Sequence, residues 1–227
     1  MIIKTQGLTK YYGKTKGIED LNLSVKQGEI FGFLGPNGAG KTTTIRLLLD
    51  LIHPSSGEVE IFGWNVHKNS LFIRQRIGYI PGELNLYPNM KGQDLLNYLI
   101  GFYNGSNPVF VSELIQRFKL DLSKKIRTYS KGMKQMLGII QAFMNDPDLL
   151  ILDEPTAGLD PFMQQEIYNL FRETKNKGKT VFLSSHNLYE VQKICDRAGI
   201  VREGRLVAIE NIDSSVNLEQ KFMNYYK

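Results

Sequence analysis

Short apolar segments recur along the chain, and stretches rich in glycine, proline or polar residues separate them. Some of these segments are apolar at nearly every position, which is typical of strands that are buried on both faces of a parallel sheet. They cover residues 30–34, 149–152 and 180–183, with a further short apolar strand at 76–80. Segments of helical pattern lie between them, at residues 41–51, 112–120 and 136–144. Because strands alternate with helices, the pattern predicts an α/β fold with a mostly parallel sheet.

Other segments alternate between apolar and polar positions, as strands with one solvated face do. These segments cover residues 21–25 and 58–62, and residues 2–5 are expected to form a further short strand. Toward the end of the chain, residues 200–202 and 206–208 flank Glu203-Gly204, which indicates a hairpin. Antiparallel strands are therefore expected at the edges of the parallel sheet.

A glycine-rich loop follows the buried strand at residues 30–34 and precedes the helical segment that begins at Lys41. Its sequence fits the pattern G-x-x-x-x-G-K-[ST], in which the backbone N–H groups point at phosphate oxygens. The Lys41 ammonium is expected to reach the β- and γ-phosphates, and the Thr42 hydroxyl is expected to ligate Mg²⁺. The predicted phosphate-binding residues are Gly35, Pro36, Asn37, Gly38, Ala39, Gly40, Lys41, Thr42 and the adjacent Thr43.

Two adjacent carboxylates, Asp153 and Glu154, end another buried strand. Ligands of open α/β sheets bind at the carboxyl ends of the strands, so both side chains are expected beside the phosphate loop. Asp153 is predicted to hold the Mg²⁺ shell through water, and Glu154 to orient or deprotonate the attacking water. The two motifs together predict hydrolysis of a nucleoside triphosphate.

A segment that contains serine and glycine lies between these motifs, with the sequence Tyr129-Ser130-Lys131-Gly132-Met133-Lys134-Gln135. Together with the phosphate loop and the Asp-Glu strand end, it resembles the signature loop of ABC-type ATPases, usually written L-S-G-G-Q. Ser130 and Gly132 match the serine and the second glycine, whereas Lys131 and Met133 replace the first glycine and the glutamine. This variant resembles the nucleotide-binding subunits of bacterial ABC-2-type exporters, and the resemblance covers nearly the whole chain.

The resemblance implies the fold of an ABC-type P-loop NTPase, with a mostly parallel core sheet, an antiparallel β subdomain and a helical subdomain. It implies a single ABC ATPase domain over residues 1–227 that binds ATP and Mg²⁺. Residues 1–84 and 141–227 are expected to form the β subdomain and the ATP-binding core. Residues 85–140 are expected to form the helical subdomain with the signature loop.

Some positions take on a role only through this resemblance. Tyr12 matches the aromatic residue that stacks on adenine, and His186 matches the histidine that contacts the γ-phosphate. With Lys41 and Glu154, His186 completes the predicted catalytic residues. Asp160, at the end of Ala157-Gly158-Leu159-Asp160, belongs to the loop that crosses the dimer interface in the family.

The chain departs from the family pattern after the strand at residues 76–80. Members of the family carry a glutamine there, which touches Mg²⁺ or the attacking water and senses the membrane partner. When Tyr87-Pro88 is aligned with the usual downstream pair, Gly82 takes the glutamine position and Glu83 follows it. Gly82 has no side chain that can act as a ligand, so Glu83 is the candidate substitute in this coupling loop.

In the family, two copies pack head to tail, and the signature loop of one copy faces the ATP that the other copy binds. The resemblance therefore implies a dimer of identical or paralogous ATPase subunits, together with a separate transmembrane permease that ATP hydrolysis drives. Such a subunit is cytoplasmic and peripheral on the inner face of the cell membrane. The variant of the signature loop favours an exporter, and the unseen permease would set the transported substrate.

The charge of the chain raises an alternative, because 28 Lys and Arg residues against 23 Asp and Glu residues give a net charge of +5. A basic protein invites a nucleic-acid interpretation. The excess lies between residues 85 and 135, however, where eight basic residues stand against three acidic ones. The alternative is a soluble ABC ATPase that acts on nucleic acid or the ribosome. Those branches carry paired ATPase units, coiled coils or zinc modules, so no nucleic-acid partner is expected here.

A small-molecule kinase built on a phosphate loop is a third interpretation, but such enzymes lack the signature loop. The single Cys195 is expected to be a buried thiol that packs as a small hydrophobic residue. The longest apolar stretch, residues 136–144, falls short of the ~20 residues that span a bilayer. Another chain would therefore have to carry the membrane spans.

Overall fold

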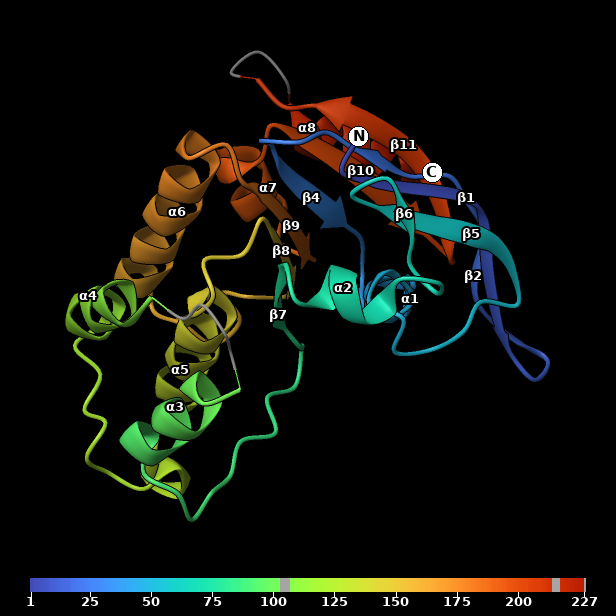
Figure 1. Ribbon diagram of the computed structural model, residues 1–227. Helices are drawn as coiled ribbons and strands as arrows, with labels where there is room; N and C mark the ends of the chain where they lie inside the picture. Colours follow the sequence, from blue (N-terminus) through green and yellow to red (C-terminus); the bar gives the residue numbers. More distant parts are fainter. Residues whose placement is uncertain (103–106, 214–216, 227) are drawn as a thin grey trace.

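A six-stranded sheet with the order β11-β10-β4-β9-β8-β7 forms the core of the molecule (Figure 1). The computed structural model describes residues 1–102, 107–213 and 217–226. Neighbouring strands from β10 to β7 are parallel, whereas β11 is antiparallel to β10, so the mostly parallel sheet and the hairpin are both confirmed. The strands are β4 (Ile30–Leu34), β7 (Ile77–Ile80), β8 (Leu149–Asp153), β9 (Thr180–Ser185), β10 (Arg197–Arg202) and β11 (Arg205–Asn211).

Alternate residues of the central strands pack into two different cores, which explains why these strands are apolar throughout. In β4, Ile30 and Leu34 join a core that the helices complete, whereas Phe31 and Phe33 join a core that a second sheet completes. Every residue of β4, β8 and β9 is buried. The prediction of strands buried on both faces is therefore confirmed.

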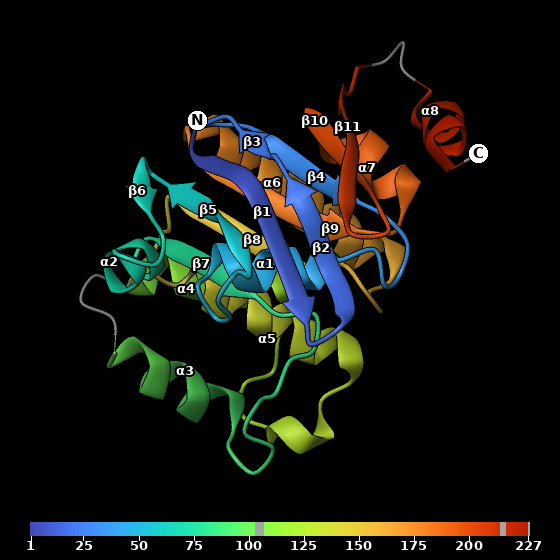
Figure 2. The same ribbon diagram turned by 90° about the vertical axis from the view of Figure 1, so that its right-hand side faces the viewer.

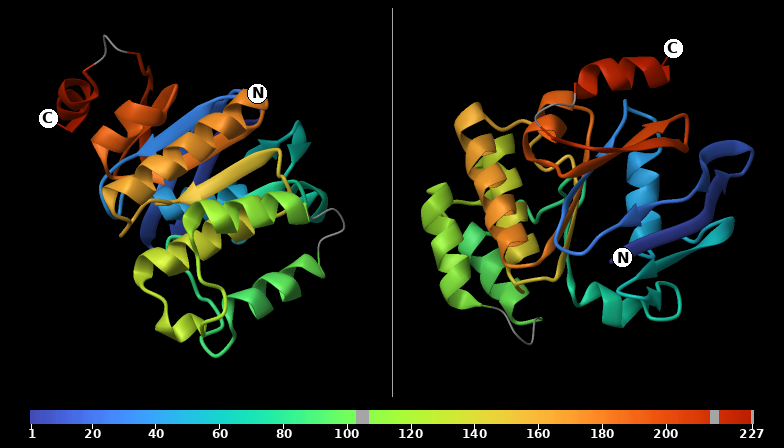
Figure 3. Two further views of the ribbon diagram at one scale, coloured as in Figure 1. Left: turned by 90° about the vertical axis from the view of Figure 1, so that its left-hand side faces the viewer. Right: turned by 90° about the horizontal axis from the view of Figure 1, so that it is seen from above.

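The second sheet is antiparallel, and the helix α1 (Lys41–Leu48) lies between it and the core sheet (Figures 2 and 3). Ile45 and Leu48 of α1 share one core with residues of both sheets. The helix that follows the phosphate loop is therefore enclosed on two sides. The strands of this sheet are β1 (Ile3–Tyr12), β2 (Thr15–Leu21), β3 (Ser24–Val25), β5 (Ser56–Ile61) and β6 (Trp64–Asn65).

The predicted strand at residues 21–25 is wrong, because Leu21 ends β2 and a separate short strand, β3, follows. The Thr5 hydroxyl donates to the Leu21 carbonyl at 2.6 Å and accepts from the Leu23 N–H at 2.9 Å. A side chain thus takes the place of a backbone partner, and the ladder is interrupted. The helix predicted at residues 41–51 also ends early, at Leu48, because the backbone turns into the left-handed region at Asp50, with φ of 52°.

Helices gather on the other side of the core sheet, around α5 (Figure 1). They are α3 (Gly92–Ile100), α4 (Pro108–Phe118), the short 3₁₀ helix η1 (Ile126–Thr128) and α5 (Lys131–Phe143). The end of α5 packs against the core through Ile139, Ile140 and Phe143, so this helix continues past residue 140, where the predicted helical subdomain ends. The division of the chain into subdomains stays a prediction, and residues 103–106 of it lie outside the described residues.

The remaining helices are α2 (Ser70–Arg74), α6 (Pro161–Asn176), α7 (Leu188–Ile194) and α8 (Leu218–Tyr226). Asp160 is the N-cap of α6, since its carboxylate accepts from the Met163 N–H at 3.0 Å. Cys195 is buried against Gly32, and burial raises the pKa of its thiol, so the expected packing role is confirmed. Across the described ranges, no helix combines the length and the apolar character needed to cross a membrane.

Candidate active site

A cavity of about 870 Å³ opens at the carboxyl ends of β4, β7 and β8. It gathers predicted residues from four separate segments: Tyr12, the phosphate loop, the pair Gly82 and Glu83, and the pair Asp153 and Glu154. The cavity also contains residues that the sequence did not single out, namely Lys16, Gly17, Arg46, Tyr79, Pro81 and Asn85. No signal in the sequence marks Lys16 or Arg46 as more than ordinary surface cations.

The phosphate loop requires glycine where it turns into α1. Gly40 has a φ of 101°, and a Cβ atom there would lie 2.6 Å from Ile18 Cγ2 and 2.9 Å from the Gly17 carbonyl. Gly38 also lies in the left-handed region, with φ of 80°. These positions keep the loop close to β2 while its backbone curls around the start of the helix.

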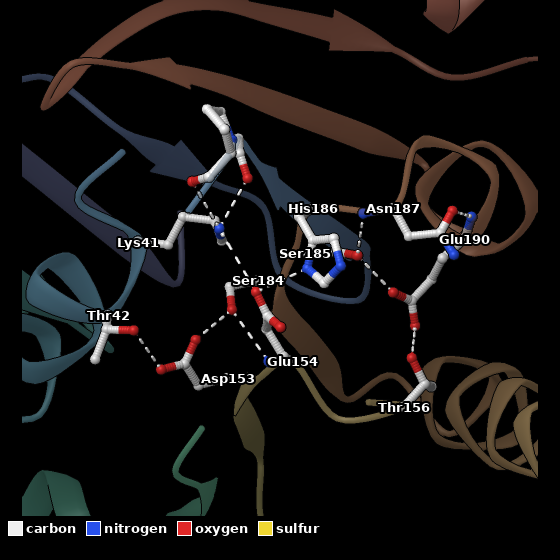
Figure 4. A network of polar contacts seen from close by, with 12 residues as sticks. Lys41, Thr42, Asp153, Glu154, Thr156, Ser184, Ser185, His186, Asn187 and Glu190 are labelled. Carbon is white, nitrogen blue, oxygen red and sulfur yellow. Dashed lines mark hydrogen bonds and ion pairs between the residues drawn. The ribbon is translucent and has the colours of Figure 1, made fainter. Parts of the chain in front are cut away.

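The Lys41 ammonium lies at the centre of this loop (Figure 4). Its Nζ atom donates to the carbonyls of Gly35 at 2.8 Å and of Pro36 at 3.0 Å, and it lies 3.6 Å from Glu154 Oε1. The side chain is only 6% exposed, so these partners offset the cost of burying its charge. The amine is therefore held where a bound phosphate would meet it.

Asp153 connects the phosphate loop to β9. The Thr42 hydroxyl donates to Asp153 Oδ2 at 2.7 Å, and the Ser184 hydroxyl donates to Asp153 Oδ1 at 2.5 Å (Figure 4). Hydroxyl and carboxylate oxygens are the donors that Mg²⁺ prefers, so this pair fits the predicted metal. The arrangement brings together the two residues that the sequence assigned to Mg²⁺.

Directly after β8 the backbone turns sharply at Glu154, which adopts the left-handed conformation with a φ of 50°. Its N–H donates to the backbone carbonyl of Ser184 at 3.2 Å and to the hydroxyl of Ser184 at 3.1 Å, which fixes the turn to β9. The carboxylate then points back toward the cavity, and its Oε1 atom lies 3.0 Å from His186 Nδ1. The structure therefore brings His186 to Glu154, although His186 does not itself line the cavity.

A buried carboxylate behind these residues, Glu190, was not predicted. Only 2% of Glu190 is exposed, and it accepts from the Thr156 and Ser185 hydroxyls, each at 2.6 Å (Figure 4). The Ser185 hydroxyl in turn accepts from the Asn187 N–H at 2.9 Å. Burial raises the pKa of Glu190. This residue ties the turn after β8 to the turn after β9, and so it positions the segments that carry Glu154 and His186.

The signature loop lies outside the cavity, at the start of α5. Ser130 is the N-cap of that helix, and its hydroxyl accepts from the Met133 N–H at 3.1 Å. Lys131 runs along Gly158, and a Cβ atom on Gly132 would lie 3.3 Å from Leu159. The structure thus joins the predicted signature loop to the loop that ends at Asp160, but it does not bring either to the cavity of the same chain.

In the coupling loop, Gly82 lies close to Asp153, the carboxylate predicted to hold Mg²⁺. A Cβ atom at this position would lie 3.1 Å from Asp153 Oδ2. Position 82 therefore faces Asp153 directly, whereas the exposed Glu83 lines the cavity beside it.

Comparisons with known proteins identify the family of this chain. Residues 18–157 match the family described as ABC transporter. The bacitracin transport ATP-binding protein of Bacillus licheniformis is 43% identical over 99% of this chain and 74% of its own length. The linearmycin resistance ATP-binding protein of Bacillus subtilis (strain 168) is 36% identical over 92% of this chain and 68% of its own length.

Solved structures confirm the predicted ABC-type fold. The ATP-binding subunit of an ABC transporter shares 30% identity and a TM-score of 0.92, over the whole of both chains. A dimeric ATP-binding cassette in a post-hydrolysis state, bound to ADP and Pi, shares 25% identity and a TM-score of 0.83, over 93% of this chain and 99% of its own. The chain therefore belongs to the ABC transporter family, as one of its ATP-binding ATPases.

Proposed function

We propose that this ATPase is the motor subunit of an exporter, in which two copies bind MgATP head to tail between them. One observation carries the dimer: the cavity gathers the phosphate loop and both carboxylates, whereas the signature loop of the same chain lies outside it. A second copy, either identical or paralogous, would supply Ser130, Lys131, Gly132 and Met133 to the ATP, with Asp160 near the interface. The dimeric cassette that resembles this chain supports the same arrangement.

The proposed roles of the binding residues follow from their positions. Tyr12 is 45% exposed and lines the cavity, so its ring is accessible for stacking on adenine, with the Lys10 ammonium 5.4 Å from the ring centroid. Residues Gly35 to Thr43 bind the phosphates, with the Lys41 ammonium on the β- and γ-phosphates. Thr42 and Asp153 would hold Mg²⁺, Asp153 through water, and the ion would neutralise charge that develops on the phosphates.

In the proposed hydrolysis, Glu154 accepts a proton from the water that attacks the γ-phosphorus, while the bond to the leaving ADP oxygen breaks. His186 lies 3.0 Å from the Glu154 carboxylate, so it orients that carboxylate and reaches the γ-phosphate from the same side. Glu83 takes the place of the coupling-loop glutamine, because Gly82 offers no side chain and Glu83 is the next acid along the cavity wall.

Export is supported by the named relatives, which include a Nod factor export ATP-binding protein of Burkholderia orbicola (strain AU 1054), 37% identical over 91% of this chain. The proposed partner is a separate transmembrane permease, which would keep the ATPase peripheral on the cytoplasmic face of the membrane. Lys91, just before α3, pairs with Lys125 through a backbone β-bridge. Both lysines are exposed, and their charges suit anionic headgroups or an acidic loop of the permease.

The dimer is tested with the Glu154→Gln variant, which keeps the shape of the side chain but cannot accept a proton. With saturating ATP and Mg²⁺, light scattering after gel filtration should give twice the monomer mass of 25.9 kDa, with no phosphate release. The matched control, Glu154→Gln combined with Lys41→Ala, should stay monomeric. A Glu154→Gln variant that hydrolyses ATP at the wild-type rate would contradict the role of Glu154.

The transport role has its own test, in which the wild-type chain is purified from detergent-solubilised membranes of its native cell. A multispanning protein should co-purify at equal stoichiometry. Fractionation of the chain with ribosomes or DNA instead would overturn the exporter and favour the nucleic-acid alternative.

A further inference from the structure

We propose that Asp50, His53 and His67 form a binding site for a transition-metal dication such as Zn²⁺, separate from the ATP site. The sequence contains three histidines, and two of them meet one aspartate here. Within the described residues, this is the one group of three side chains whose ligand atoms are close enough to share a metal ion; they all lie within 4.8 Å of one another.

The distances from each histidine to Asp50 are close to those of a tetrahedral site. His67 Nδ1 lies 3.2 Å from Asp50 Oδ1, and His53 Nδ1 lies 3.6 Å from the same oxygen. In a tetrahedral Zn²⁺ site with bonds of about 2.0–2.2 Å, neighbouring ligand atoms are about 3.3–3.5 Å apart. The two imidazole rings lie edge to face at 81°, so both nitrogens approach Asp50 from different directions. Small rotations of the two side chains would therefore place a metal between the three ligands.

The backbone already fixes these ligands. The Asp50 N–H donates to the Leu47 carbonyl at 3.1 Å, and the Lys10 ammonium donates to the His53 carbonyl at 2.6 Å. Next to His67, the N–H of the buried Val66 donates to the Val59 carbonyl at 3.0 Å. Hydrogen bonds thus hold the backbone of both segments, and only the side chains would need to be ordered when the metal binds.

The surroundings favour a cation of intermediate softness. Two imidazoles and one carboxylate suit Zn²⁺, Co²⁺, Ni²⁺ or Cu²⁺, whereas Mg²⁺ and Ca²⁺ prefer oxygen ligands alone. Asp50 directly follows the end of α1, where the helix dipole adds partial negative charge. The Lys10 ammonium opposes this attraction, but it is directed at a backbone carbonyl. Both histidine side chains are 70% exposed, so a metal can reach them.

The site lies at the opposite end of α1 from Lys41, one short helix away from the phosphate loop. Three protein ligands leave a fourth position for water or for a side chain of a partner. The metal would link the segment after α1 to the segment after β6, close to the exposed Leu51.

The experiment is a titration of the purified full chain, without nucleotide, with ZnCl₂ and separately with CoCl₂. We expect one Zn²⁺ per chain, and visible absorption bands of tetrahedral Co²⁺ that Zn²⁺ removes. His67→Gln and Asp50→Asn should each weaken Zn²⁺ binding about 100-fold or more, since even outer-shell changes cost 10–100-fold. Asn tolerates the left-handed conformation of position 50, so this variant should keep its fold.

The matched control is His186→Gln, which removes the third histidine and should leave one Zn²⁺ per chain with unchanged affinity. Thermal melts of each variant in a chelator show whether the fold is kept. Zn²⁺ should raise the melting temperature of wild type and of His186→Gln, but not that of His67→Gln. Equal Zn²⁺ binding by wild type, His67→Gln and Asp50→Asn would overturn the proposal, as would loss of the site in His186→Gln alone.

Discussion

The phosphate loop and the signature loop both contain glycine and both lead into the first turn of a helix, yet the chain surrounds only one of them. Lys41 is buried. Its ammonium donates hydrogen bonds to backbone carbonyls of the phosphate loop and lies near Glu154. Ser130 and Lys131 are exposed, and the Ser130 hydroxyl serves its own helix. Helix N-termini attract phosphate groups. At the start of α1 the surrounding residues enclose this N-terminus, whereas at the start of α5 it is exposed.

The difference also concerns rigidity. α1 is enclosed between two sheets, whereas the exposed start of α5 lies beside the loop around Gly158. The phosphate loop is thus supported by an enclosed helix, whereas the signature loop lies at an exposed helix end. Variants that change one loop and spare the other can test this comparison.

Lys41→Ala should have the largest effect, and it should be confined to the first region. Charged hydrogen bonds contribute about 1.5–3 kcal/mol each, and Lys41 would make two to the phosphates, so ATP affinity should fall at least about 100-fold. Fluorescence titration of the monomer measures this loss. Lys131→Ala, the matched change in the signature loop, should leave monomer affinity unchanged; an equal loss in both variants would break the comparison.

Ser130→Arg should affect the second region alone. The bulky cation would block the face that meets the other copy, so in a Glu154→Gln background the ATP-bound dimer should disappear while monomer affinity is kept. Gel filtration with light scattering measures the dimer. Ser112→Arg, on the exposed face of α4, is the control and should leave the dimer intact. Persistence of the dimer in Ser130→Arg would contradict the cross-interface role.

Glu190→Ala should destabilise the turns that support the first region. Its removal leaves the Thr156 and Ser185 hydroxyls without their acceptor, which costs about 2–4 kcal/mol of the free energy of unfolding. Urea unfolding measures the loss, and turnover should fall as well because Glu154 is less well positioned. The exposed Glu219→Gln is the control, with no change expected.

The Glu190→Gln variant tests the same residue through the pH dependence of the free energy of unfolding. Burial raises the pKa of Glu190, so the folded chain holds this proton more tightly than the unfolded chain does. The corresponding stability is present below the unfolded pKa and is lost as pH rises through the folded pKa. Relative to wild type, Glu190→Gln should therefore gain stability as pH rises above about 4.5, the ordinary value. A difference that does not change with pH would contradict this assignment.

Glu83→Ala should have the smallest effect, a fall in ATP hydrolysis of several-fold, about 1 kcal/mol in the barrier, with unchanged ATP affinity. The carboxylate lines the cavity but has no fixed contact with Asp153 or Glu154 among the described interactions. Phosphate release at saturating ATP measures the rate. Glu113→Ala, exposed on α4, should match wild type. A wild-type rate in Glu83→Ala would show that Glu83 has no part in hydrolysis.

The sequence predicted those parts of the fold and site whose signals are local. Continuous apolar runs predict the core strands, and the glycine-rich motif predicts the phosphate loop before α1. β2 was missed because Thr15-Lys16-Gly17 is polar, and its strand conformation comes from pairing with β1. α5 starts before the predicted helix, because the N-cap at Ser130 carries it through the polar signature loop.

The missed parts of the site depend on tertiary contacts. Glu190 has the sequence context of an ordinary acid in the first turn of a helix, and only the approach of Thr156 and Ser185 makes it a buried link. Likewise, His53 and His67 are far enough apart in the sequence that neither suggests the other. Both cases involve side chains that meet across loops, where hydrophobic periodicity carries no information.

The left-handed backbone at Glu154 has a consequence for the evolution of this chain. A side chain with a Cβ atom in that region costs about 1–2 kcal/mol, and glycine would avoid it. Glycine would lose part of that gain, about 0.5–1 kcal/mol, through greater freedom of the unfolded chain. Selection for stability alone would therefore tolerate glycine at position 154, whereas the role in turnover proposed above requires a carboxylate there, against a mild thermodynamic pressure.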